Sequence, residues 1–434
     1  MSAAATSGIA PHPGAAAFRS LVLAALVLAG AAVYPDAPDI SGTIESASEA
    51  AAGAGGAPGF SLGFEEYANL RLKASAGERG TVYAAVNLVA LAGAPADLAA
   101  RAAEAADLAG YALPVTSFVT GENYAAALEL ERLYIRIRGE SLDLEAGLLR
   151  IPLGYGLAWR PLDFLAPPNP LVPNARPRGV LGTVVSAYPS ETARVKAFLA
   201  AGADPLESGG EGTVLGAAAD VHGRRASLLG LYAFQTPSSG HSRGIHRAGI
   251  SAKLEAGAGI VLEALYEYDP DADPGPEGLQ AALGLDYSFL DGDLYVLGQY
   301  LYNGPGALAP GDDLGDLYDS SGDPWYETDP AERIPAAGMT IAELNRRNYL
   351  YSALTYRWSD YTRSTLSWAL SPDDLSFSPD LTIEHEPFQG MTVSLSCRAF
   401  LDPRSLSGSG NYGELGPVNT GRYASLGLRA RLKF

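Results

Sequence analysis

Apolar and polar residues alternate along most of the chain, and the C-terminal segment shows this pattern clearly. Every second residue from Ala424 to Phe434 is alanine, leucine or phenylalanine, whereas the residues between them are polar or small. Strict alternation over such a length is typical of a β-strand whose two faces meet different solvents. An apolar face toward lipid and a polar face toward an aqueous interior is the pattern of a transmembrane β-barrel.

The same two-residue period recurs from residue 39 to the C-terminus, and tyrosine and tryptophan tend to fall toward the segment ends. Aromatic girdles at the two membrane interfaces have this placement. We therefore predict an all-β, transmembrane antiparallel barrel of about eighteen strands, with sixteen as the alternative count. The predicted strands are 39–48, 60–74, 79–92, 123–138, 141–151, 179–188, 192–201, 212–221, 224–235, 246–256, 259–269, 279–289, 291–302, 348–358, 361–371, 378–386, 390–401 and 421–434.

The connections between these strands fall into two classes. If the C-terminus lies in the periplasm, the connections on that side are short: 75–78, 139–140, 189–191, 222–223, 257–258, 290, 359–360 and 387–389. The connections on the other side are mostly long: 49–59, 93–122, 152–178, 202–211, 236–245, 270–278, 303–347, 372–377 and 402–420. Short periplasmic turns and long extracellular loops are the arrangement of a bacterial outer-membrane barrel.

The N-terminal segment has the features of a secretory signal peptide. Leu21 to Val33 is the longest apolar block; Arg19 precedes it, and small residues end it. Thirteen residues are too few to cross a bilayer as a helix, which takes about 20. We predict that residues 1–32 are a cleaved signal peptide and that 33–434 form the barrel, with a short buried helix as the alternative for the apolar block.

Composition excludes several classes of protein. The formal net charge of −19 excludes non-specific binding to nucleic acid through bulk positive charge. The single cysteine, Cys397, excludes an intramolecular disulfide and a zinc site with several cysteines.

Signals for catalysis and for metals are weak. Gly240 to Gly244 satisfies the G-x-S-x-G pattern, but it lies in a predicted loop and lacks the strand–turn–helix context of a nucleophile elbow. His385 stands between Glu384 and Glu386, whose side chains point to the opposite face of a strand. We predict no enzymatic activity, no catalytic residue, no metal site and no cofactor.

The predicted interior carries rows of opposite charge. Arg132, Arg136 and Arg138 share one parity, opposite to leucine and isoleucine neighbours, so they are expected on one interior face. Opposed charges across a pore create a constriction that favours polar or charged solutes. The alternative is that these charges pair with one another and solvate the wall. Further pore candidates by the same parity argument are Glu263, Glu267, Arg357, Arg429 and Arg431.

The long connection 152–178 is rich in proline and carries two glycines, Gly154 and Gly156, that permit close backbone approach or positive φ angles. A structureless connection of this length is unusual without a function. We expect it to fold inward as a constriction, and the alternative is an external loop over the barrel mouth. Its candidate solute-facing residues, with the end of the preceding strand, are Arg150, Arg160, Asp163, Arg176 and Arg178.

This region also resembles a known family. The stretch Leu144–Phe164, LEAGLLRIPLGYGLAWRPLDF, is followed by PPNP at 167–170 and RPRGV at 176–180. A strand ending in arginine, then glycines, a Pro-x-Asp element and an Asn-Pro-rich stretch, resembles the corresponding segment of alginate-export-type outer-membrane porins. The resemblance covers about 40 residues and implies a channel in the outer membrane.

The sequence thus predicts an outer-membrane porin for passive diffusion of small hydrophilic solutes, anions or saccharides among them. The alternative function is a structural or surface-binding barrel with a closed lumen and working external loops, chiefly 303–347. Expected partners are outer-membrane lipid, the solutes, and the barrel-assembly machinery, which would recognise the C-terminal strand ending in Phe434; nucleic acid is not expected.

Overall fold

The computed structural model describes residues 38–53, 59–93, 116–121, 124–166, 179–201, 212–237, 243–270, 275, 278–304, 306, 344, 346–402, 414–415 and 422–434. The predicted signal peptide, 1–32, lies outside the described residues. No helix in the described part of the chain is long and apolar enough to span a membrane.

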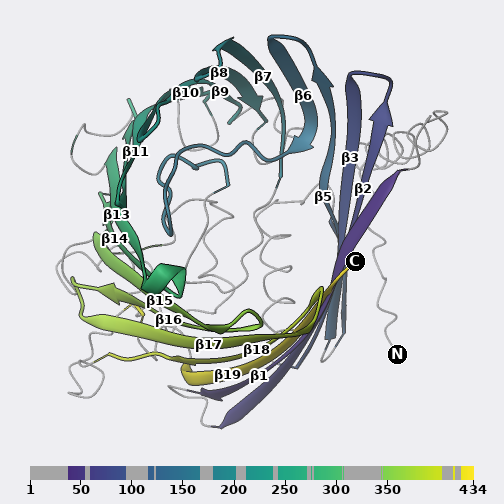
Figure 1. The fold of residues 1–434 in the computed structure, drawn as a ribbon, viewed down its shortest axis with the longest axis vertical. Helices are drawn as coiled ribbons and strands as arrows, with labels where there is room; N and C mark the ends of the chain where they lie inside the picture. The colour runs from purple at the N-terminus through teal and green to yellow at the C-terminus, as the bar shows by residue number, and fades with distance from the viewer. Residues whose placement is uncertain are drawn as a thin grey trace, which may run out of the picture.

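The described residues form one antiparallel sheet that closes on itself (Figure 1). Its first ten strands are β1 (Asp39–Gly53), β2 (Phe60–Ala76), β3 (Gly80–Gly93), β4 (Thr116–Gly121), β5 (Tyr124–Arg138), β6 (Leu142–Leu149), β7 (Val180–Ser190), β8 (Ala193–Ala200), β9 (Val214–His222) and β10 (Ala226–Gln235). The remaining nine are β11 (Ile245–Ala256), β12 (Ala258–Tyr268), β13 (Leu279–Phe289), β14 (Leu294–Asn303), β15 (Asn348–Ser359), β16 (Thr362–Ser371), β17 (Ser376–Phe388), β18 (Met391–Ala399) and β19 (Arg422–Lys433).

Eighteen of the nineteen strands make the circuit of the barrel, as predicted. Each pairs with its neighbours in chain order, β3 pairs directly with β5, and β19 pairs with β1 from Lys433 opposite Thr43 to Arg422 opposite Gly53. The extra strand, β4, pairs with the first half of β5. The predicted connection 93–122 contains β4, whose six residues, TSFVTG, do not alternate between apolar and polar.

The two ends of the barrel differ as expected. At one end, here called the short-turn end, the connections are 77–79, 139–141, 191–192, 223–225, 257, 290–293, 360–361 and 389–390, and β1 begins and β19 ends there. The 3-10 helix η2 (Leu290–Gly292) lies in one of these turns. The other connections meet at the opposite end, here called the long-loop end.

The two faces of the wall also differ. Leucine, isoleucine and aromatic side chains point outward and are largely exposed, for example Leu62, Leu283 and Leu428, at 46–55%. Inward positions of the same strands hold buried polar groups such as Glu45, Asn69 and Glu263. The alternation of the sequence therefore corresponds to an apolar outer surface and an interior that is in large part polar.

Candidate functional site

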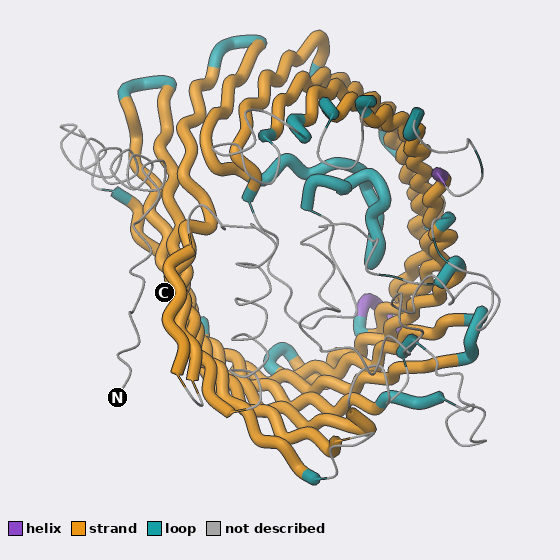
Figure 2. The backbone as a smooth tube through the Cα atoms, turned by 180° about the vertical axis from the view of Figure 1, so that it is seen from behind, coloured by secondary structure: helices purple, strands orange, loops and turns teal. Residues whose placement is uncertain are grey.

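The segment after β6 turns into the barrel. Figure 2 shows this loop within the ring of strands. β6 pairs with β5 only over Leu133–Arg138, and β4 occupies the same side of β5 over Tyr124–Glu129. Because β4 continues the wall beyond the end of β6, the chain is free to leave the wall after Leu149. We call residues 150–166 the inner loop.

The apolar side of the inner loop packs on an apolar part of the inner wall. Ile151, Leu153 and Leu162 are at most 2% exposed. They form one cluster with inward side chains of β7 to β10 and β12: Val184, Phe198, Ala200, Val214, Ala218, Leu229, Leu231, Ala233 and Leu265. The inner loop therefore lies against the wall from β7 to β12, which we call the covered wall. Residues 151–166 do not form the external loop that was the alternative prediction.

Glu263 holds the inner loop at mid-height. It lies at the centre of β12, and its Oε1 accepts hydrogen bonds from the backbone N–H of Tyr155 (2.5 Å) and of Gly156 (2.6 Å). The Ser251 hydroxyl donates a third, at 3.0 Å. Glu263 was predicted to line the pore, but it is completely buried beneath the loop. Its carboxyl therefore positions the backbone of the loop.

Gly154 makes this close approach possible. Its φ of +79° lies in the left-handed region, and a Cβ at this position would lie 2.1 Å from Glu263 Oε1. Only glycine meets both requirements without strain. The predicted role of this glycine, positive φ with close approach, is confirmed.

A second anchor holds the loop farther round the barrel. The Gln299 side chain on β14 accepts from the N–H groups of Ala158 (2.7 Å) and Trp159 (2.8 Å), and donates to the Trp159 carbonyl at 2.8 Å. The Trp159 ring is buried against Leu301 and Tyr349. The loop thus reaches from the covered wall to β15.

The inner loop carries its own ion pair. Arg150 Nη2 lies 3.2 Å from Asp163 Oδ2, and the Asp163 side chain has no exposed surface. Burial raises the pKa of Asp163 from 3.8 to about 6, although the charges of Arg150 and Arg160 oppose the rise. Three of the predicted constriction residues are therefore close together, with two cations for one acid.

Arg247 on β11 contacts both the wall and Phe164, near the end of the inner loop. Its Nε donates to Glu267 Oε2 at 2.6 Å, its Nη1 donates to Gln235 at 2.7 Å, and its guanidinium lies 5.0 Å from the centre of the Phe164 ring. A guanidinium over an aromatic face is a favourable cation–π contact. Glu267, a predicted pore residue, is thus paired through a residue that the sequence analysis did not single out.

The wall formed by β19, β1, β2, β3 and β5 lies outside the apolar cluster, and we call it the charged wall. Glu45 accepts from Arg429 at 2.6 Å and from Arg431 at 2.7 Å. Arg136 pairs with Glu145 on the neighbouring strand β6. Three of the predicted arginines therefore lie inside the barrel in ion pairs, two of them sharing one carboxylate.

A polar network continues along the charged wall. Asn69 donates to Asn87 Oδ1 (2.6 Å) and to Glu131 Oε2 (2.8 Å), and Asn87 donates to Glu129 at 3.1 Å. Glu131 is the extra residue of a bulge in the β3–β5 pairing, which lets Glu129, Glu131 and Arg132 all face inward. Arg132 contacts Glu131 at 3.4 Å.

The remaining predicted residues lie elsewhere. Arg138, at the end of β5, is exposed and stands opposite Asp143 in the register. Arg357 pairs with Asp293 at the short-turn end, at 2.7 Å, with both side chains about half exposed. Arg176 and Arg178 lie outside the described residues.

Sequence reasoning missed one histidine contact. His222 Nε2 lies 3.1 Å from Asp220, and its Nδ1 lies 3.1 Å from the Ser227 hydroxyl across the β9–β10 pair. Arg194 donates twice to the same aspartate, at 2.7 and 3.0 Å. The i, i+2 spacing of Asp220 and His222 on one strand face is the signal that could have revealed the contact. His385, in contrast, bonds to Thr362, while Glu384 pairs with Arg363.

Comparison with known proteins gives structural matches only. No family model and no curated protein matches the sequence. The fold resembles a BenF-like porin from Pseudomonas fluorescens Pf-5, with a TM-score of 0.53 and 8% identity over 92% of this chain and 99% of that one. It also resembles Pseudomonas aeruginosa OccK2 (OpdF) in complex with glucuronate, with a TM-score of 0.51 and 10% identity over 92% and 98%. Acinetobacter baumannii OccAB4 gives 0.50 and 10% over the same shares. The chain therefore has the fold of a porin-like β-barrel.

Proposed function

We propose that the protein is a passive channel of the bacterial outer membrane for small hydrophilic solutes, with anions and saccharides as its favoured classes. The observation that carries the proposal is the accessibility of charged groups inside a closed barrel. The side chains of five inward arginines keep 20–33% of their surface exposed: Arg132, Arg136, Arg150, Arg429 and Arg431. Charged groups that keep solvent contact inside a barrel are typical of a water-filled passage.

The inner loop supplies the constriction in this proposal. Glu263 and Gln299 hold its backbone at two places near the middle of their strands, so the loop narrows the lumen within the membrane-spanning part of the barrel. Arg150 and Arg160 are then the charges that a passing solute meets on the loop side, with the buried carboxyl of Asp163 close to both. Arg429 and Arg431 are those on the charged wall.

The local charge balance favours anions. Two arginines share Glu45, and two are close to Asp163, so each of these carboxyl groups faces two positive charges. The OccK2 structure with the same fold holds glucuronate, an acidic sugar. The resemblance of Leu144–Phe164 to alginate-export-type porins supports a channel and does not specify its solute.

Export and assembly follow from the same proposal. Residues 1–32 would be removed as a signal peptide during export. The C-terminal strand would be recognised by the barrel-assembly machinery through its apolar face and Phe434, whose ring is 59% exposed at the short-turn end. On this reading the short-turn end is periplasmic.

The test is single-channel recording of refolded residues 33–434 in a planar bilayer, with reversal potentials in a salt gradient and in sodium glucuronate. We expect discrete open steps, an anion preference, and a glucuronate current. A folded barrel that never conducts would contradict the proposal and favour the alternative, a surface-binding barrel with a closed lumen.

A further inference from the structure

One acidic side chain faces lipid. Inward and outward residues alternate along β2, with Tyr67 and Asn69 buried on the inner face and Phe64 and Leu70 about half exposed on the outer one. Glu66 has the outward parity and is exposed. Its partner among the described residues is the outward hydroxyl of Ser46 on β1, which donates to Oε1 at 2.6 Å.

Glu66 lies deep in the apolar band. On the outer face of β2, Phe60, Leu62 and Phe64 precede it, and Ala68, Leu70 and Leu72 follow it. Three outward positions cover about 20 Å of strand on either side, or roughly 15 Å of height at the usual tilt. Since the apolar band of such barrels is about 25 Å tall, the carboxyl lies near the middle of the bilayer.

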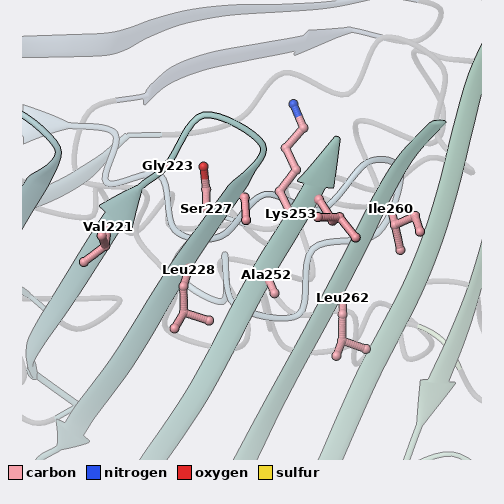
Figure 3. A pocket seen from close by; sticks show the side chains of 10 residues that line it. Val221, Gly223, Ser227, Leu228, Ala252, Lys253, Ile260 and Leu262 are labelled. Carbon is pink, nitrogen blue, oxygen red and sulfur yellow. The ribbon is translucent and has the colours of Figure 1, made fainter. Parts of the chain in front are cut away.

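The rest of the outer face is different. Among the outward positions of the strands whose side chains the structure describes, Glu66 is the one aspartate, glutamate, lysine or arginine. Figure 3 shows the usual pattern over β9 to β12, where Val221, Leu228 and Leu262 line a shallow outer groove. Lys253 points away from their side chains and pairs with Glu255 at 2.7 Å.

A carboxyl group in the hydrocarbon region of a bilayer needs hydrogen-bond donors from a protein. Lipid tails offer neither water nor hydrogen-bond donors, and ionisable residues at this depth normally mark a functional contact. The patch around Glu66 contains both halves of such a contact: one acceptor carboxyl, and the hydroxyls of Ser46 and Ser48, which are neighbouring outward positions of β1. A surface that carries its own donors and acceptors is complementary to itself.

We propose that a second copy of this chain docks on this face, in a two-fold contact in which the Ser48 hydroxyl of each copy donates to the Glu66 carboxyl of the other. The outward register neighbours of Ser46 and Glu66 are alanines, Ala430 on β19 and Ala90 on β3. Short side chains beside the carboxyl allow two walls to approach closely, as small residues do at membrane interfaces.

Thiol cross-linking of the refolded full barrel in lipid vesicles tests the proposal. The native cysteine is exposed on β18, so every variant carries Cys397→Ser. In this background Ala90→Cys should give a covalent dimer with a bis-maleimide that spans about 15 Å, because a two-fold axis between β1 and β2 places the two Ala90 positions about three strand spacings apart. Ala264→Cys, an outward alanine on β12 in the opposite part of the strand order, is the matched control and should stay monomeric.

Substitutions of Glu66 separate a specific contact from random collision. Added to Ala90→Cys, Glu66→Leu should lower dimer yield about tenfold, the size expected for one or two polar contacts between membrane-spanning segments. Glu66→Gln, which keeps an acceptor and adds donors, should retain the dimer. Equal yields at both cysteine positions, a dimer that survives Glu66→Leu, or monomers throughout would overturn the proposal. Conductance of the same variants is recorded in parallel, so loss of the dimer is distinguished from loss of the channel.

Discussion

The interior of the barrel has two contrasting parts. Along the covered wall, from β7 to β12, inward side chains such as Phe198, Leu229 and Leu231 are apolar and lie under the inner loop. Along the charged wall, inward polar side chains bond to their neighbours: Asn87 donates to Glu129, and Glu45 accepts from the accessible Arg429 and Arg431. The same eighteen-strand circuit therefore supports a packed core on one side and a polar surface on the other.

The difference lies in what the inward positions can pack against. An apolar inner wall is unfavourable beside water, and a loop with apolar residues at 151, 153, 162 and 165 removes it from solvent. A charged inner wall needs no such cover, because its polar groups satisfy one another or remain in water. We conclude that the covered wall fixes the shape of the passage, whereas the charged wall sets its electrostatic preference.

The largest expected effect comes from breaking the loop anchor on the covered wall. Glu263→Ala leaves the buried N–H of Gly156 without its acceptor, at a cost of about 1–3 kcal/mol, and leaves the N–H of Tyr155 with the Ser251 hydroxyl, at 3.1 Å, as its remaining acceptor. We expect the inner loop to detach, with faster hydrogen exchange across 151–166 and a larger single-channel conductance. Glu384→Ala, which removes a carboxylate far from the loop, is the control. Unchanged exchange in Glu263→Ala would show that the apolar contacts alone hold the loop.

A substitution of Gly154 tests the same anchor, because an added Cβ would crowd the Glu263 carboxyl. Gly154→Ala places a Cβ against Glu263 Oε1 at a φ of +79°, and we expect a loss of about 1–3 kcal/mol from strain at that backbone position. Gly230→Ala is the matched control, since a Cβ there meets nothing within 4 Å. Denaturant titrations in the same vesicles compare the two variants. Equal stability would mean that the loop shifts to accommodate the methyl group.

An intermediate effect is expected when the charged wall is altered. Glu45→Gln removes the negative charge that Arg429 and Arg431 share, which makes the charged wall more positive beside the lumen. We expect the anion-to-cation permeability ratio to rise about two- to fivefold. This is the effect of a change of about 0.5–1 kcal/mol in the electrostatic energy of an anion relative to a cation beside the wall. Reversal potentials at low salt provide the measurement, and a ratio that falls would refute the assignment.

The fold was predictable because alternation is a direct consequence of two solvents. Every one of the eighteen predicted segments overlaps a strand of the circuit, and the short and long connections fall at opposite ends. Even the first segment, predicted at 39–48, forms β1 and closes the barrel against β19. β4 was missed because its pairing depends on the early departure of β6 from the wall, which is a tertiary effect.

The site was predictable only in part. The alternation of inward and outward positions along each strand correctly placed Arg136, Arg429 and Arg431 inside the barrel. It could not distinguish an inward acid that lines the lumen from one that lies beneath a loop. Glu263 is of the second kind, and Gln299 has no charge to attract attention. One signal was available: β10 is apolar on both faces from Leu228 to Phe234, which a strand with a wet inner face should not be.

A smaller effect is expected from pH. Because the pKa of Asp163 is raised to about 6 by burial, its carboxylate loses charge as the pH falls through 6, whereas an ordinary aspartate does so near 4. Arg150 and Arg160 are then less compensated, so anion preference should increase in this range. For stability, the raised pKa means that the neutral form of Asp163 favours the folded state, so the stability that this group contributes at low pH is lost as the pH rises from 3.8 through about 6. Asp163→Asn should abolish the transition near pH 6 in reversal potentials, and its persistence in that variant would assign it to another group.

The smallest effect is expected at Arg357, which shares the parity of the other predicted pore residues but lies on neither contrasting wall. It pairs with Asp293 at the short-turn end, and both side chains are about half exposed. An ion pair in such a setting contributes about 0–1 kcal/mol and is screened by salt. We therefore expect Arg357→Gln to leave stability and reversal potential nearly unchanged, while Arg429→Gln lowers the anion preference. Equal shifts from the two substitutions would mean that charge at the mouth, rather than charge along the wall, sets selectivity.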